Sequence, residues 1–353
     1  MPSRPPDIKE FLKTLRREPA LYVPNAELGI HPLVKERFLG HPIRSVVDEI
    51  EFWWKAGYDY VKLQPTVNFD PAGIAAQRNL MANEDGSVVR KWASEQNGII
   101  ISRTDLEHYV FPRIDEIGYE HITKGKRELP RGMGIVGQYG DIFTMTWEMM
   151  GFENFSMAVY EEPDLVNDLN QRIGEIVLGM FEKMAGDPAV DALWYSDDIA
   201  YATGLMVSPA ALRRYFFPWL KQVGDLAKSS GKPLIYHTDG LLYDVMDEII
   251  ASGVDALHPI EPKAMDLAEV KRRYGDRLCL IGHVDVDMLA RGTEAEVREQ
   301  VRKNIAAAWN GTGYCAGSGN SIPEYVKYEN YMAMLDEVNK AGSGDWGLGS
   351  GTR

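Results

Sequence analysis

The chain has 353 residues and a formal net charge of −14, and this length allows one large domain or two ordinary ones. An acidic protein repels the phosphate backbone of nucleic acid and the surface of an anionic membrane, so we expect neither among its partners. Two cysteines imply no disulfide framework, and the N-terminal residues lack the apolar core of a signal peptide, so the sequence predicts a cytoplasmic protein.

Eight short apolar runs, rich in β-branched or aromatic residues, predict strands. In chain order they cover residues 21–24, 58–63, 133–138, 192–196, 233–236, 254–259, 278–282 and 313–317. Segments with helical periodicity lie between several of them, at residues 163–186, 208–231 and 293–309. Because eight strands alternating with helices form a parallel sheet, we expect an α/β fold closed as a (β/α)8 TIM barrel. A doubly wound open sheet is the alternative, although no glycine-rich dinucleotide motif follows the first run.

The connection between the second and third runs, residues 65–131, is too long for a plain loop. It predicts an insertion that forms a lid or one side of a pocket. Within it, residues 84–103 suggest a hairpin with turns at Asp85-Gly86 and Asn97-Gly98. The sequence therefore predicts a single domain over residues 1–341, followed by a flexible tail at residues 342–353.

Polar side chains gather just after the predicted strands, where the active sites of (β/α)8 barrels lie. The predicted catalytic residues are Asp197, Asp198, His237 and Asn320. The predicted substrate-binding residues are Gln64, Gln138, Tyr139, His283 and Asp285. Several of these residues have simpler alternatives, because Asp197, Asp198 and Asp285 could cap helices, and the neighbouring His258 could be a buried, hydrogen-bonded histidine.

The segment Tyr-His-Thr-Asp-Gly at residues 236–240 places His237 and Asp239 two positions apart. On an extended backbone both side chains point to the same side. With Glu261, His283 or Asp285 as a further ligand, they predict a site for zinc or another divalent metal. The alternative is that Asp239 caps the next helix and His237 only bonds to a neighbour.

Four segments, at residues 204–223, 236–240, 255–286 and 317–335, resemble the uroporphyrinogen decarboxylase superfamily. The resemblance implies a barrel over nearly the whole chain. True uroporphyrinogen decarboxylases bind substrate carboxylates through arginines after the first strand, and they carry an aspartate after the second strand and a histidine near the end.

This chain departs from the decarboxylase pattern at all three places. Residues 25–32 contain no arginine, Gln64 stands where the aspartate is expected, and Asn320 stands where the histidine is expected. A polyanionic substrate needs cationic anchors, so the departures argue against decarboxylation of a tetrapyrrole. Arg103 and Arg131 border the predicted lid and are the arginines that remain for an acidic substrate.

The superfamily also contains corrinoid-linked methyltransferases. Those that act on coenzyme M hold zinc through a His-x-Cys pair and a later cysteine, where this chain has His237, Asp239 and Asn320. Other members use carboxylate ligands, take methyl groups from methoxylated aromatics or methylated amines, and give them to a corrinoid protein. The set of His, Asp and Glu residues at the strand ends resembles this second group more closely.

Three functions remain open. The first is a methyltransferase that moves a methyl group from a small O- or N-methyl compound to a cobalamin-type corrinoid on a partner protein. The second is a decarboxylase or lyase of a small or tetrapyrrole acid, and the third is a catalytically silent barrel that binds a ligand. The sequence leaves the assembly open, with a homodimer as one form that it allows.

Overall fold

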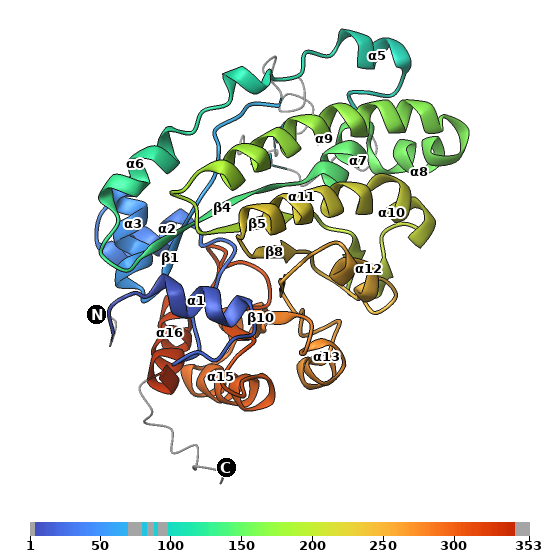
Figure 1. The fold of residues 1–353 in the computed structure, drawn as a ribbon. Helices are drawn as coiled ribbons and strands as arrows, with labels where there is room; N and C mark the ends of the chain where they lie inside the picture. Colours follow the sequence, from blue (N-terminus) through green and yellow to red (C-terminus); the bar gives the residue numbers. More distant parts are fainter. Residues whose placement is uncertain (1–3, 70–79, 83–87, 91–97, 343–353) are drawn as a thin grey trace.

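The computed structural model describes residues 4–69, 80–82, 88–90 and 98–342, and a curled parallel sheet lies at its centre. Figure 1 shows long helices, among them α9 and α11, packed along the outside of this sheet. Its seven strands, in spatial order, are β1 (Tyr60–Leu63), β4 (Gly134–Gly140), β5 (Ala192–Ser196), β8 (Leu234–His237), β9 (Ala256–His258), β10 (Cys279–Val284) and β11 (Tyr314–Ser318). The α/β class and the parallel sheet are therefore confirmed.

The prediction of an eighth strand at residues 21–24 was wrong. The segment is irregular, and the chain beyond it forms a single parallel bridge between Asn25 and Ala316 of β11. The Ala26 N–H donates to the Ala316 carbonyl at 2.8 Å, and the Ala316 N–H donates to the Pro24 carbonyl at 2.9 Å. The physical reason lies partly in Pro24, which has no N–H and so cannot extend a ladder of hydrogen bonds.

Helices and short strands connect the seven strands of the sheet. The helices are α1 (Ile8–Leu15), α2 (Pro32–Leu39), α3 (Val46–Lys55), α5 (Arg103–His108), the 3-10 helix η1 (Ile114–Glu116), α6 (Glu120–Glu128), α7 (Ile142–Met150), α8 (Phe152–Glu161), α9 (Pro163–Gly186), α10 (Pro209–Tyr215), α11 (Phe217–Ser230), α12 (Met246–Ala251), α13 (Leu267–Tyr274), α14 (Val286–Arg291), α15 (Glu294–Ala308) and α16 (Tyr328–Gly342). The short strands are β2 (Leu80–Ala82), β3 (Val88–Arg90), β6 (Ala200–Tyr201) and β7 (Gly204–Leu205). Among the helices of the described residues, none combines the length and the apolar composition that crossing a bilayer requires.

Two of the three predicted helical segments are single helices, α9 and α15. The third, at residues 208–231, divides into α10 and α11 at Phe216. Pro218 explains the break, because it lacks an N–H and its ring excludes the carbonyl of the residue four positions earlier. Gly231 ends α11 in the left-handed region, with φ of 70°.

The long connection between β1 and β4 carries structure of its own. Strands β2 and β3 pair antiparallel, with Leu80 opposite Arg90, so a hairpin is present around the predicted Asp85-Gly86 turn. That turn, Asn97 and residues 343–353 of the predicted tail lie outside the described residues. The later part of the connection forms α6, which packs against α3 and β4 (Figure 1). Its role as a lid stays a prediction.

Glu27 joins the irregular segment near Pro24 to the sheet on both sides, through its buried carboxyl group on one side and its backbone on the other. The Ser318 N–H donates to Oε1 of Glu27 at 2.7 Å, and Oε2 lies 2.7 Å from the Ser318 hydroxyl. On the other side, the Tyr60 hydroxyl accepts from the Glu27 N–H and donates to the Glu27 carbonyl, both at 3.0 Å. Burial raises the pKa of Glu27 to about 8, so this side chain holds a proton at neutral pH.

Glu27 predicts a pH-dependent stability. Its pKa is raised from 4.5 in the unfolded chain to about 8 in the fold. Its stabilising contribution is therefore complete below pH 4.5 and is lost as the pH rises through about 8. Glu27→Gln reproduces the neutral acid. In urea unfolding at several pH values, we expect wild type to lose roughly 1.4 kcal/mol per pH unit relative to this variant within that window.

The control for this measurement is Glu153→Gln, at an exposed position of α8. Its unfolding free energy should follow that of wild type at every pH. If the Glu27→Gln and wild-type curves also run parallel, Glu27 does not hold a proton in the folded protein.

Candidate functional site

The carboxyl ends of the parallel strands bring the predicted residues to one edge of the sheet. Ser196 at the end of β5 is in register with His237 at the end of β8, and His237 is in register with His258 at the end of β9. Asp198 follows β5, and Asn320 follows β11. Side chains that are more than 100 positions apart in the sequence thus meet at the same edge, as the barrel interpretation requires.

Asp198, His237 and Asp239 form a compact group, which we call the donor cluster. One potential ligand atom from each lies within 4.8 Å of the others. Nε2 of His237 is 3.9 Å from Oδ1 of Asp198, which also accepts the Asp239 N–H at 3.0 Å. Asn320 donates its side-chain N–H to Oδ2 of Asp239. The other oxygen of Asp239, Oδ1, is buried and has no hydrogen-bond partner in the part of the chain that the structure describes.

The donor cluster carries excess negative charge. Burial, followed by the nearby carboxylates of Asp198 and Glu261, raises the pKa of Asp239 to about 8. Glu261 itself accepts the Gly240 N–H at 2.7 Å through Oε2. A proton on Asp239 or a bound cation would relieve the repulsion between these carboxylates.

His237 and His258 face each other through their Nδ1 atoms, 2.8 Å apart. Burial lowers the pKa of both rings, so both are neutral near pH 7 and one donates to the other. When His237 is the donor, its Nε2 carries a lone pair that faces Asp198. This is the tautomer of a metal-binding histidine, held by a partner behind it.

The environment of His258 is consistent with that positioning role. Its side chain is fully buried, and the ring lies edge-on to Trp194 with the ring centroids 5.1 Å apart. Nε2 of His258 has no hydrogen-bond partner in the described ranges. His258 is thus the buried, hydrogen-bonded histidine of the simpler interpretation, and its partner is the central imidazole of the donor cluster.

The donors of the cluster fit a divalent metal. One imidazole nitrogen and carboxylate oxygens are ligands that zinc accepts and that harder cations prefer. The buried, unpartnered Oδ1 of Asp239 and the number of neighbouring carboxyl groups also favour a bound cation. Asp198 is the third potential ligand beside His237 and Asp239. The predicted ligand Glu261 instead accepts a hydrogen bond from the Gly240 backbone N–H.

Asp197 has a different environment from its neighbour Asp198. It is fully buried and accepts the N–H groups of Phe143 at 2.7 Å and Thr144 at 2.9 Å, together with the Tyr195 hydroxyl at 2.7 Å. These bonds hold the first turn of α7 against the sheet, which is the capping alternative for this residue. Burial raises the pKa of Asp197 to about 6, but its oxygens face donors of the fold and not the donor cluster.

Other predicted residues lie around this edge without joining the donor cluster. Gln138 donates to the Ser196 hydroxyl at 3.1 Å, and Tyr139 is its neighbour in β4. The ring of His283 bonds to the Ile260 carbonyl at 2.8 Å, and its φ of 84° is a rare backbone state for a non-glycine residue. Asp285 caps α14 by accepting a hydrogen bond from the Asp287 N–H, which is the helix-capping alternative for this residue.

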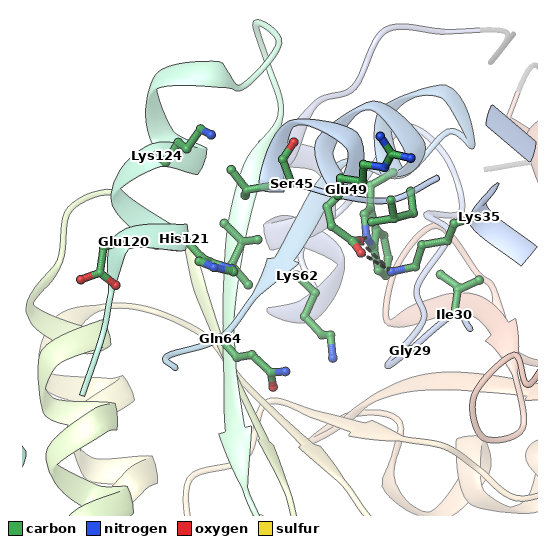
Figure 2. A pocket seen from close by; sticks show the side chains of 15 residues that line it. Gly29, Ile30, Lys35, Ser45, Glu49, Lys62, Gln64, Glu120, His121 and Lys124 are labelled. Atoms are coloured by element: carbon green, nitrogen blue, oxygen red, sulfur yellow. Dashed lines mark hydrogen bonds and ion pairs between the residues drawn. The ribbon is translucent and has the colours of Figure 1, made fainter. Parts of the chain in front are cut away.

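One cavity lies at the end of β1, and a second is lined by residues that contact the donor cluster or the turn after it. The first, of about 680 Å³, lies between the end of β1 and helices α2, α3 and α6; its polar lining residues are Lys35, Arg44, Ser45, Glu49, Lys62, Gln64, Glu120, His121 and Lys124. Figure 2 shows the side chains of Lys62 and Gln64 pointing in the same direction from β1 and the residues after it. The second, of about 570 Å³, is lined by Glu261, Asp285 and Asn320 among others.

Sequence reasoning missed Lys62. The signal was present, because a lysine inside the apolar run at residues 58–63 has no simple place in a buried strand. It lies in β1, and its Nζ donates to Oε1 of Gln138 at 3.2 Å. Burial lowers the pKa of Lys62 to about 8.

Comparison with known proteins identifies the family. The sequence profile described as Uroporphyrinogen decarboxylase (URO-D) matches residues 95–341. The chain belongs to this family. The superfamily predicted from the four sequence segments is therefore confirmed. Within this URO-D chain, the donor cluster lies inside the matched region, and Lys62 and Gln64 lie ahead of it.

The curated relatives are distant. The uroporphyrinogen decarboxylase of Aeromonas salmonicida (strain A449) is 23% identical over 239 residues, and the match spans 64% of each chain, less than two thirds of the relative's length. That of Chlorobium phaeobacteroides (strain DSM 266 / SMG 266 / 2430) is 25% identical over 287 residues, which cover 76% of this chain and 79% of the relative. Among solved structures, a methyltransferase from Methanosarcina mazei superposes with a TM-score of 0.67 at 16% identity, over 94% of this chain and 97% of its own. That likeness is one of fold.

Replacing Asp197 and replacing Asp198 should change the stability of the protein by very different amounts. Asp197→Ala removes the acceptor of three hydrogen bonds from a buried position, so we expect a loss of about 3 kcal/mol in the free energy of unfolding. Asp198→Ala, at a side chain that is 46% exposed, should change it by less than about 1 kcal/mol. Urea unfolding measures both. Equal losses for the two variants would contradict the division of roles.

Proposed function

We propose that this URO-D family member is an enzyme that moves a methyl group from a small O- or N-methyl compound to a corrinoid carried by a partner protein. The observation that supports the proposal most directly is the donor cluster of Asp198, His237 and Asp239 at the strand ends. Its nitrogen and carboxylate donors resemble the metal sites of the methyltransferases that act on methoxylated aromatics and methylated amines. A soft thiolate site for a thiol acceptor is absent from these positions of the sequence.

Asp198, His237 and Asp239 would hold the metal. A divalent metal in this position supplies Lewis-acid polarisation of the oxygen or nitrogen that carries the methyl group. The unpartnered Oδ1 of Asp239 supports this assignment, because a buried carboxylate oxygen otherwise lacks compensation.

The surrounding residues keep these donors in place. Asn320 fixes Asp239 through Oδ2 and leaves Oδ1 available. His258 fixes the ring of His237 from behind, and Glu261 holds the backbone of Gly240 at the turn that follows the pair. Such supporting contacts set the orientation of ligands and are a regular part of metal sites.

The proposed reaction transfers the methyl group as a cation equivalent. The bond between the methyl carbon and the oxygen or nitrogen breaks, and the methyl group passes without its bonding electrons to the reduced corrinoid of the partner. The electron pair stays on the departing oxygen or nitrogen, which takes up one proton. The half-exposed position of Asp198 leaves this edge of the donor cluster open to solvent, which can supply that proton.

A second candidate is a decarboxylase or lyase that acts on a small acid. The curated relatives carry the name of a decarboxylase, and the first cavity has the cations that an acidic substrate would need. If neither reaction occurs, a ligand-binding barrel without catalysis is what remains of the three functions.

The methyltransferase proposal predicts formation of methylcobalamin. Purified protein is incubated with cob(I)alamin and a panel of methoxyarenes and methylamines, and absorbance follows the product. We expect protein purified without chelator to contain a divalent metal in stoichiometric amount. Because His237→Ala and Asp239→Asn each remove a ligand, the rate should fall about 100-fold or more.

The matched control is Asp244→Asn, at an exposed aspartate after the same strand, which should keep the wild-type rate and metal content. The metal assignment fails if wild-type protein carries no stoichiometric metal and added Zn²⁺ or Co²⁺ does not raise its melting temperature. Methyl transfer is excluded for the panel if no methylcobalamin forms.

A separate prediction concerns uroporphyrinogen. The protein should not convert it to coproporphyrinogen at a useful rate, since residues 25–32 offer no arginine and Gln64 replaces the expected aspartate. An anaerobic assay with product analysis by chromatography measures this. Appearance of coproporphyrinogen would establish the decarboxylase alternative.

A further inference from the structure

Lys62 is a half-buried cation that faces the first cavity without a carboxylate partner. Its side chain donates to the neutral amide of Gln138, and no carboxylate within the described ranges lies within ion-pair distance. Burying an ammonium group in this way costs free energy, and an anionic ligand would offset that cost. The lowered pKa of Lys62, caused first by burial and then by nearby Lys35, reflects the same imbalance.

The other charges around the cavity leave this imbalance in place. Lys35 pairs with Glu49, with Nζ at 2.7 and 2.8 Å from the two carboxylate oxygens (Figure 2). The side chains of Arg44 and Lys124 also line the cavity, and within the described residues neither forms an ion pair. The cavity therefore has a surplus of positive charge in a protein whose formal net charge is −14. That contrast favours an anionic ligand over a neutral one.

An apolar side completes the cavity. Trp53, Ile30, Leu63 and Val46 belong to its lining, and Trp53 is almost wholly buried in the core behind it. Apolar lining with a few polar groups is typical of sites for small organic molecules. The combination fits an organic acid with an apolar body better than an inorganic anion.

Two hydrogen bonds connect Lys62, through Gln138, with Ser196 at the end of the strand beside His237. Nζ of Lys62 donates to Gln138, and Gln138 donates to the Ser196 hydroxyl at 3.1 Å. Ser196 is in register with His237 on the next strand. A ligand anchored at Lys62 would thus lie near Gln138, whose other hydrogen bond is to the strand beside His237.

We propose that the first cavity binds a small organic acid, with its carboxylate on Lys62 and the side-chain amide of Gln64 beside it. The further step, that this acid is the methyl donor, rests on the proposed methyltransferase function. The carboxylate site itself depends only on the charges and shape of the cavity. Lysines and Arg44 from other elements would supply the positive charge that residues 25–32 lack.

The test is calorimetric titration of the full chain, without corrinoid, with para-methoxybenzoate, benzoate and short aliphatic acids, each beside its primary amide. The amide keeps the shape and removes the charge. We expect at least one acid to bind wild type about tenfold or more tightly than its amide. Lys62→Met should weaken that acid about tenfold to a hundredfold and leave the amide within about threefold, and Lys62→Arg should restore most of the affinity.

Lys228→Met, at an exposed lysine of α11, is the matched control and should bind as wild type does. The proposal is overturned if no acid binds wild type more tightly than its amide, a comparison that needs no variant to fold. It is also overturned if folded Lys62→Met binds the acids as wild type does.

The methyl-transfer assay distinguishes the two proposals. Binding of para-methoxybenzoate that depends on Lys62, without methylcobalamin formation from it or from the neutral donors, supports the carboxylate site and counts against the proposed function. Methyl transfer from neutral methoxyarenes, with no preference for acids and no effect of Lys62→Met, supports the function and overturns the site.

Discussion

A carboxylate that leaves water must be compensated by hydrogen-bond donors, by a proton or by a cation, and the carboxyl edge of this sheet shows all of these demands. Asp197 receives three donors from α7 and Tyr195. Glu27 holds a proton against Ser318. Asp239 receives one donor from Asn320, and its second oxygen has no partner in the described part of the chain. Incomplete hydrogen bonding therefore distinguishes Asp239 of the candidate site from Asp197 and Glu27, which hold the fold.

A cation that leaves water also needs compensation, and Lys62 at the end of β1 is the example in this structure. Lys62 is half-buried with an amide for a partner, so the cavity before it has more cations than carboxylates, while the donor cluster brings carboxyl groups together. Gln138 and Ser196 lie between the two and keep them apart with neutral hydrogen bonds. A ligand with an anionic end and a polarisable oxygen or nitrogen would match both regions at once, which is why we treat them as parts of one site.

Much of the fold could be predicted from the sequence, because buried parallel strands appear as short apolar runs whatever their neighbours are. The failures have local causes. Residues 21–24 have the composition of a strand, but Pro24 and the side chain of Tyr60 replace a ladder of backbone bonds. Residues 208–231 have one apolar periodicity, and Pro218 nevertheless divides them. Strand composition does not reveal whether the ladder to the next strand is complete.

The site was predictable only in part. The pair His237 and Asp239 stands out by its alternation at a strand end. The different roles of Asp197 and Asp198 could not be read, because they depend on which of two adjacent side chains points toward α7. Lys62 stands out as a lysine in an apolar run, but the cavity that it faces depends on how α2, α3 and α6 pack, which the sequence does not reveal. The contact between His237 and His258 likewise depends on the pairing of β8 with β9.

The cavity and the donor cluster come from different stretches of the chain. Residues 29–64 and 120–124 form the lining of the first cavity, and residues after β5, β8 and β11 form the donor cluster and its Asn320 contact. Changes in α2, α3 or α6 can therefore reshape the chamber while the donors keep their geometry on the rigid sheet. In evolutionary terms, such a layout allows the small molecule to change through substitutions within the first 124 residues, while the donor cluster is inherited unchanged.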